Sequence, residues 1–153
     1  MVKDKVLTGA AGEYYIGFRL TAQGYAVGLT VRGARAIDMV VANPNSGKSI
    51  AIQTKTMLDA FVQSRKWGPY WKWRVGTTSL RPAHETFFYA FIDLRDDPSK
   101  TPHVFILPSV QLTPPLLELY PEKGPTKDTW CVIYEKDQGN YLNRWDLIRD
   151  ALA

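Results

Sequence analysis

The sequence contains little cysteine, little histidine and no long apolar run. One cysteine among 153 residues excludes an internal disulfide, and the two histidines lack the spacing of metal ligands. No apolar run is long enough to cross a bilayer, and residues 1–15 hold no apolar segment followed by a cleavage site. Cys131 stands in a strand-like apolar run, where a buried thiol is expected. These features predict a cytoplasmic protein without a membrane partner.

The chain also lacks internal repeats, low-complexity tracts and linkers, so one domain over residues 1–153 is expected. Its charge is unevenly distributed. Residues 1–85 hold 12 basic residues (Lys or Arg) and 5 acidic residues (Asp or Glu). Residues 86–153 hold 7 basic and 10 acidic residues. A basic half favours a polyanionic partner such as nucleic acid, although a solvated basic surface has the same composition.

Apolar periodicity and turn-forming residues predict an α/β (α+β) fold with a central mixed sheet, in the order α-β-β-β-(mixed)-β-β-α-β-α. Helices are predicted at 8–23, 108–119 and 142–152, and Gly24 is expected to end the first of them. Strands are predicted at 25–31, 36–42, 49–56, 87–94, 104–107 and 130–134. The turn-rich NPNSGK joins the second and third strands as a hairpin, and Gly33 marks a turn before it. Residues 57–85 are aromatic-rich and receive no assignment.

Residues 46–56, SGKSIAIQTKT, contain two motifs that point in different directions. The GKS beginning at Gly47 matches the end of a phosphate-binding loop, but Ala42 stands where that loop requires its first glycine. The IAIQTKT that follows alternates like a strand, so no helix N-terminus is offered to a phosphate. The GKS is therefore interpreted as part of the hairpin turn.

The second motif is the triplet Gln53-Thr54-Lys55. Side chains alternate along a strand, so Gln53 and Lys55 share one face while Thr54 joins the core face. If the hairpin closes at NPNSGK, Asp38 at the start of the preceding strand lies beside this pair. Asp38 interrupts an apolar run, and a carboxylate there is unfavourable unless it is paired or bound to a cation. A salt bridge from Asp38 to Lys55 or Arg35 is the structural alternative.

A third charged residue interrupts the first predicted helix. Glu13 shares a stripe with Ile16, Gly17 and Leu20, where a surface glutamate at the stripe edge is the alternative. Together with Asp38 and the triplet, Glu13 suggests a site for a hard cation with a lysine beside it. Mg²⁺ prefers oxygen ligands and keeps several waters, so one or two carboxylates suffice. Such an ion activates water for phosphodiester hydrolysis.

The segments GEYYIGFRLTAQGYAV, AIDMVV and SIAIQTK together resemble the PD-(D/E)XK nuclease superfamily, which has the restriction-endonuclease-like fold. Within it they are similar to Holliday-junction-resolvase-like and methyl-directed-restriction-like branches. The specific motifs cover residues 8–56, and the strands within 87–107 match more loosely. The resemblance implies that Glu13 is the helix acid, Asp38 the central metal ligand, Gln53 the second-ligand position and Lys55 the catalytic lysine.

The same resemblance implies a Mg²⁺-dependent DNA endonuclease, with Mn²⁺ able to replace Mg²⁺, acting on branched or otherwise structured DNA. A homodimer is also expected. Two positions depart from the family pattern. Ile37 replaces the proline, and Gln53 replaces an acid, which removes a negative charge and weakens metal binding. A catalytically silent nucleic-acid-binding module of the same fold, or a structural protein whose buried charges pair, are the alternatives.

Residues 65–74, RKWGPYWKWR, interleave basic and aromatic side chains. This pattern is typical of surfaces that pair with phosphates and stack on bases. The residues predicted to contact nucleic acid are Arg35, Arg65, Lys66, Trp67, Trp71, Lys72 and Arg74. The alternative is that the aromatic residues form a small core over a sheet edge and leave the charges in solvent.

Overall fold

The computed structural model describes residues 4–31, 37–76, 84–112 and 129–153. Helix α1 (Lys5–Thr21) begins three residues before the predicted start, because the Asp4 side chain caps it by accepting hydrogen bonds from the backbone N–H groups of Val6 and Leu7. Gly24 adopts a φ of +94° just after the helix, in the left-handed conformation expected of a residue that ends one.

The central sheet has five strands in the order β1-β2-β3-β6-β7. Their bounds are β1 (Ala26–Leu29), β2 (Met39–Ala42), β3 (Ser49–Met57), β6 (Phe87–Asp93) and β7 (His103–Pro108). The predicted hairpin of β2 and β3 is confirmed, with Met39 opposite Ile52 and Gly47 at a φ of +74° in the turn. Strands β3 and β6 are parallel and the other neighbours are antiparallel, so the sheet is mixed, as predicted.

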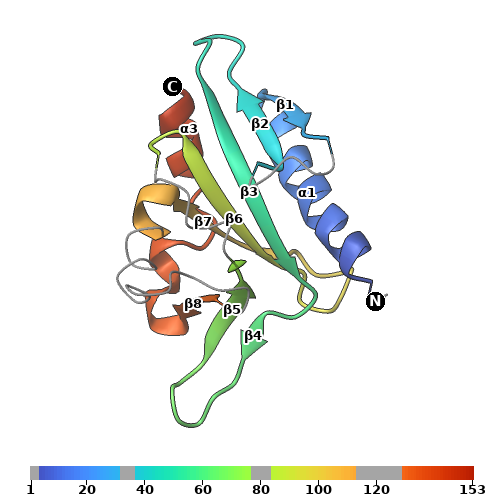
Figure 1. Ribbon diagram of the computed structural model, residues 1–153, viewed down its shortest axis with the longest axis vertical. Helices are drawn as coiled ribbons and strands as arrows, with labels where there is room; N and C mark the ends of the chain where they lie inside the picture. The colour runs from blue at the N-terminus through green and yellow to red at the C-terminus, as the bar shows by residue number, and fades with distance from the viewer. Residues whose placement is uncertain (1–3, 32–36, 77–83, 113–128) are drawn as a thin grey trace.

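A second sheet occupies the region that showed no clear sequence pattern. Strands β4 (Phe61–Val62) and β5 (Tyr70–Arg74) form a hairpin, and β8 (Trp130–Tyr134) pairs with β5. The turn between β4 and β5 makes the lower tip of the molecule in Figure 1. Strand β8 has the predicted bounds, but its pairing with β5 joins segments distant in sequence and could not be read from either one.

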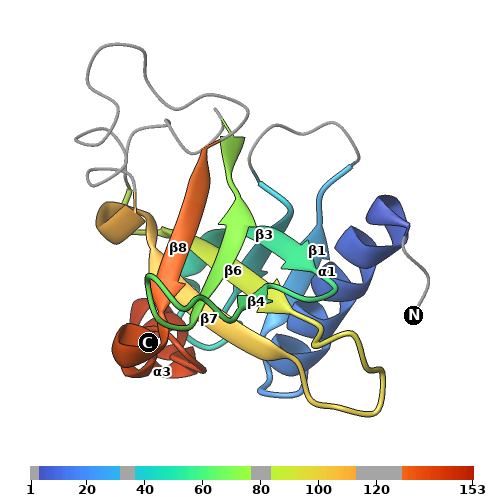
Figure 2. The same cartoon turned by 90° about the horizontal axis from the view of Figure 1, so that it is seen from below.

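Two apolar cores lie on the two faces of the central sheet. Helix α1 and helix α3 (Trp145–Leu152) pack on one face, where Ile16 and Ile148 are buried. The three-stranded sheet covers the other face, with Trp71 and Trp73 buried beneath it. Figures 1 and 2 show the helices and the small sheet around the long strand β3. Each long central strand is therefore buried on both sides.

The remaining boundaries differ modestly from the prediction. Helix α3 begins at Trp145 rather than at 142, because the chain first forms the 3₁₀ helix η2 (Glu135–Asn140) and Asn143 has a φ of +54°. Residues 109–112 are helical, as expected, and the rest of that predicted helix lies outside the described residues, as does Gly33. No helix in the described part of the chain is long and apolar enough to span a membrane.

Candidate functional site

Asp38 lies immediately before β2 and holds the end of the hairpin together. Its N–H donates to the carbonyl of Ile52 at 3.0 Å. Its Oδ2 accepts from the Thr54 N–H at 2.6 Å and from Thr54 Oγ1 at 3.0 Å. The carboxylate therefore sits against the Gln53-Thr54-Lys55 triplet, as the hairpin predicted. Among the described residues these bonds, and not an ion pair, account for its placement.

Gln53 is nearly inaccessible, with 5% of its surface exposed. Its Oε1 has no hydrogen-bond partner among the described residues. Leaving a buried polar group unsatisfied costs about 1–3 kcal/mol, so such atoms in folded proteins usually have an additional partner. Gln53 follows Ile52 on β3, so its side chain points away from the helices and toward the second core. The Gln53 oxygen, one residue from the Thr54 that bonds the Asp38 carboxylate, is suited to a cation or a water molecule.

Lys55 is half-buried and shares the strand face of Gln53. Burial lowers the pKa of its amine below the ordinary value of 10.5, and the nearby Asp38 carboxylate offsets part of that effect. A lysine with a lowered pKa exchanges protons more readily near neutral pH. Lys55 also lines a cavity, so it connects the Asp38 carboxylate to accessible space.

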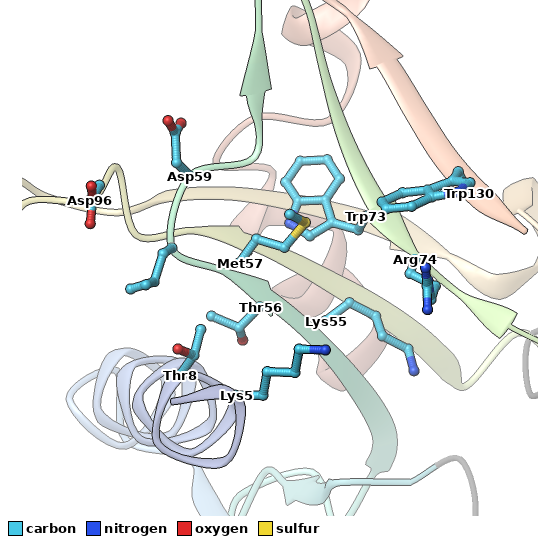
Figure 3. A pocket seen from close by; sticks show the side chains of 11 residues that line it. Lys5, Thr8, Lys55, Thr56, Met57, Asp59, Trp73, Arg74, Asp96 and Trp130 are labelled. Atoms are coloured by element: carbon cyan, nitrogen blue, oxygen red, sulfur yellow. The ribbon is translucent and has the colours of Figure 1, made fainter. Parts of the chain in front are cut away.

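That cavity has a volume of about 670 Å³ and lies between α1, the end of β3 and the small sheet. Figure 3 shows the cationic ends of Lys5, Lys55 and Arg74 on one side and the carboxylates of Asp59 and Asp96 on the other. Three cations around one space favour an anionic ligand such as a phosphate. Charge is therefore separated across the cavity, and its Lys55 end is the basic one.

Two residues near Lys55 were missed by sequence reasoning. Lys5 escaped because the helix was predicted to begin at Thr8, which left Lys5 outside it. Trp130 escaped because its position beside the cavity depends on the pairing of β8 with β5. A cap signal at Asp4 could have found the first. No local signal could have found the second.

Glu13 approaches from the helix side of the sheet. It is half-buried on α1, one residue from Gly12. Gly12 packs so closely on β3 that an added Cβ would overlap Thr56 Oγ1. Thr54 and Thr56 lie on this helix face of β3, whereas Gln53 and Lys55 lie on the opposite face, so Glu13 is on the side of Thr54.

The donor set suits a hard cation bound through few protein ligands. No group of three or more His, Cys, Asp or Glu side chains gathers within the described ranges. The Asp38 carboxylate and the Gln53 oxygen are nevertheless oxygen donors at the same end of the β2–β3 hairpin, and Mg²⁺ commonly uses one or two carboxylates together with waters. The residues present therefore fit the Mg²⁺ expected from the sequence.

The predicted nucleic-acid contacts divide into buried and exposed residues. Trp71 is 5% exposed and its Nε1 donates to Asp93 Oδ2 at 3.1 Å, so the prediction that it stacks on a base is wrong and its role is in the core. Arg65, Lys66, Trp67 and Arg74 are exposed and Lys72 is half-buried. Arg35 lies outside the described residues.

Comparison with known proteins gives a structural likeness and no sequence match. No family model matches the chain, and no curated protein sequence matches it. The fold is similar to the structure of a bacterial homing endonuclease, I-Ssp6803I, with a TM-score of 0.60 and 15% sequence identity. The match covers 97% of this chain and 94% of that one. The mixed α/β fold with a restriction-endonuclease-like core, predicted from the sequence, is therefore confirmed.

Proposed function

We propose that the chain is a metal-dependent endonuclease that hydrolyses phosphodiester bonds in DNA. The observation that carries the proposal is the Asp38 carboxylate bonded to Thr54 of the triplet, between the buried Gln53, whose Oε1 has no partner among the described residues, and Lys55, which lines the cavity. A carboxylate close to a half-buried lysine of lowered pKa suits Mg²⁺-assisted hydrolysis. The fold shared with an endonuclease supports the reaction class.

Each side chain has a role that follows from its position. Asp38 would be the central ligand of the cation and Gln53 the second one, while the acid of α1, Glu13, would add negative charge from the helix face of β3. A bound Mg²⁺ would supply a Lewis acid and a water of lowered pKa. Lys55 Nζ would accept a proton from the attacking water, because its lowered pKa leaves more of the amine neutral. Lys5 and Arg74 would bind phosphate oxygens in the cavity.

The decisive experiment measures cleavage of supercoiled plasmid and of branched DNA with Mg²⁺ or Mn²⁺. Asp38→Asn isolates the role of the negative charge, because the amide oxygen can still accept a hydrogen bond from the Thr54 N–H. Its cleavage should fall to background while its melting temperature stays close to that of the wild type. Asp150→Asn, which neutralises an exposed carboxylate on α3, is the matched control and should cleave normally. Equal activity of Asp38→Asn and wild type would refute the assignment.

A catalytically silent DNA-binding module is the second candidate. It is favoured by glutamine at position 53 in place of an acid, and by the lack of a three-residue acidic or histidine cluster within the described ranges. A gel shift in EDTA together with no cleavage of any DNA form would support it. Branched DNA as the substrate and the homodimer both stay predictions. Sedimentation of the free protein and of its DNA complex tests whether the protein is a homodimer.

A further inference from the structure

The outward face of the small sheet carries aromatic rings and cations in one continuous patch. Alternation on β5 and β8 buries Trp71, Trp73, Cys131 and Ile133 and turns their neighbours outward. The register places the outward residues in pairs across the two strands: Tyr70 with Tyr134, Lys72 with Val132, and Arg74 with Trp130. We call these six residues, together with Lys66, Trp67 and Lys136, the aromatic face.

Cations lie over the rings of this face, of which Trp67 is exposed and Trp130 and Tyr134 are half-buried. Lys72 Nζ is 4.8 Å and Arg74 Cζ is 5.3 Å from the centre of the Trp130 ring. At the tip of the β4–β5 turn, Lys66 Nζ is 4.6 Å from the ring of Trp67, which is 61% exposed. Lys136 Nζ lies 5.9 Å from the ring of Tyr134. Each of these rings therefore has a positive charge within reach of a neighbouring phosphate.

The hollows along the aromatic face adjoin the cavity of the candidate site through shared lining residues. A hollow of about 330 Å³ over β5 and β8 is lined by Trp130, Tyr134 and Trp67, among others. It shares Trp130 with the cavity that holds Lys55, and it shares Trp67 and Tyr134 with a third hollow beside η2. Glu135 is the one carboxylate among the described residues that line the two outer hollows. The hollow over β5 and β8 and the Lys55 end of the cavity are therefore basic, whereas Lys136 and Glu135 balance one another beside η2.

We propose that the aromatic face binds a single-stranded DNA segment, whose bases stack on Trp67, Tyr134 and Trp130 while its phosphates pair with Lys66, Lys72, Arg74 and Lys136. This inference rests on the proposed function in taking DNA as the partner, and it names unpaired DNA as the form recognised. The bases of a duplex are stacked on one another and leave only their edges exposed, so they could not use exposed ring faces. The segment would continue into the cavity beside Lys55.

The test measures binding without cleavage. A labelled single strand and a duplex of the same length are titrated in EDTA by fluorescence anisotropy. Trp67→Ala should weaken single-strand binding by about 5- to 150-fold, the range expected for the loss of one base–aromatic stack. Duplex binding should change far less, and Trp67→Phe should recover most of the single-strand affinity. Lys72→Gln should reduce the dependence of single-strand binding on salt by about one counterion.

The matched control is Phe18→Ala, which removes an aromatic ring that is 67% exposed on α1, away from this face. It should bind both DNA forms normally. Equal losses for Phe18→Ala and Trp67→Ala, or unchanged single-strand binding by Trp67→Ala, would overturn the inference. Asp38→Asn separates the two proposals, because it should lose cleavage while it keeps single-strand binding. If single-strand binding depends on Trp67 while no DNA is ever cleaved, the proposed function fails and the aromatic face stands.

Discussion

Lys55 is the residue that links the hairpin end to the cavity, and its amine is held with a lowered pKa. Burial is the larger cause and the Asp38 carboxylate opposes it. A lysine whose pKa is lower in the folded than in the unfolded state destabilises the fold while it is charged. That penalty is present below the lowered pKa and is relieved as the pH rises from there toward 10.5.

We therefore expect Lys55→Met to melt no lower than the wild type at about pH 7, because the fold no longer holds a half-buried ammonium group. As the pH rises toward about 10, the wild type should gain stability relative to the variant. Thermal melts of both proteins across this range check the sign. A variant that melts well below the wild type at neutral pH would mean that the attraction of Asp38 outweighs burial.

Gln53→Glu tests the cation site from the other direction. Without metal, the new carboxyl group would be buried beside Asp38, which raises its pKa and destabilises the fold at neutral pH. With metal, the added charge should tighten binding. We expect the variant to melt below the wild type in EDTA and to gain more stability than the wild type from millimolar Mg²⁺ or Mn²⁺.

The control for this prediction is Gln53→Glu combined with Asp38→Asn, which relieves the repulsion and removes the central ligand. The double variant should respond little to metal. If neither the wild type nor Gln53→Glu responds to either ion, the pair is not a cation site, and the silent binding module becomes the better interpretation.

At the scale of elements, α1 is placed by one close contact with β3. An added Cβ at Gly12 would overlap Thr56 Oγ1, whereas one at Gly9, a turn earlier, would meet nothing within 4 Å. Both glycines lie inside the helix, where alanine is preferred by about 1 kcal/mol. The same substitution should therefore have opposite effects at the two positions.

We expect Gly9→Ala to stabilise the fold by about 0.5–1 kcal/mol. Gly12→Ala should destabilise it by about 1–3 kcal/mol, because the helix must move away from the strand. Urea unfolding measures both. Thr56→Ala should restore much of the loss in the Gly12→Ala background, since it removes the overlapping oxygen. If Gly12→Ala is as stable as Gly9→Ala, this contact does not set the helix position.

At the scale of the whole molecule, the two cores share the central sheet. Phe88 and Tyr89, neighbours on β6, belong to the helix-side core and to the small-sheet core respectively. If the central sheet opened, the apolar side chains of both cores would be exposed together. Strand β5 links the small sheet to the centre through the Trp73 Nε1 hydrogen bond to the carbonyl of Ile92 at 3.0 Å.

We therefore expect a single cooperative unfolding transition. Tryptophan fluorescence follows mainly the small sheet, because Trp71, Trp73 and Trp130 lie on its strands while Trp145 lies on α3. It should coincide with helical circular dichroism, which follows α1 and α3. Both signals are recorded in the same urea titration. Separate midpoints would show that the small sheet opens independently, so that the cavity between it and α1 could open without global unfolding.

The sequence by itself determined the β2–β3 hairpin and the polar side chains that it brings together. Alternation along β3 and the turn at NPNSGK are local properties, so the common face of Gln53 and Lys55 and the nearness of Asp38 could be predicted. The order of the main strands followed from apolar periodicity for the same reason. The start of α1 at Lys5 is also set locally, by the Asp4 cap, and the sequence prediction placed it three residues later because it did not include that cap.

Only the tertiary structure decided what surrounds Lys55. The parallel pairing of β3 with β6 and the antiparallel pairing of β5 with β8 join segments far apart in the chain, and no local pattern specifies such a partner. Those pairings bury Trp71, leave Trp67 exposed, and bring Trp130 to the cavity. Composition marked residues 65–74 as aromatic and basic. The pairing of β5 with β8, and the packing of the small sheet on the central sheet, determine which of these rings face the core and which face solvent.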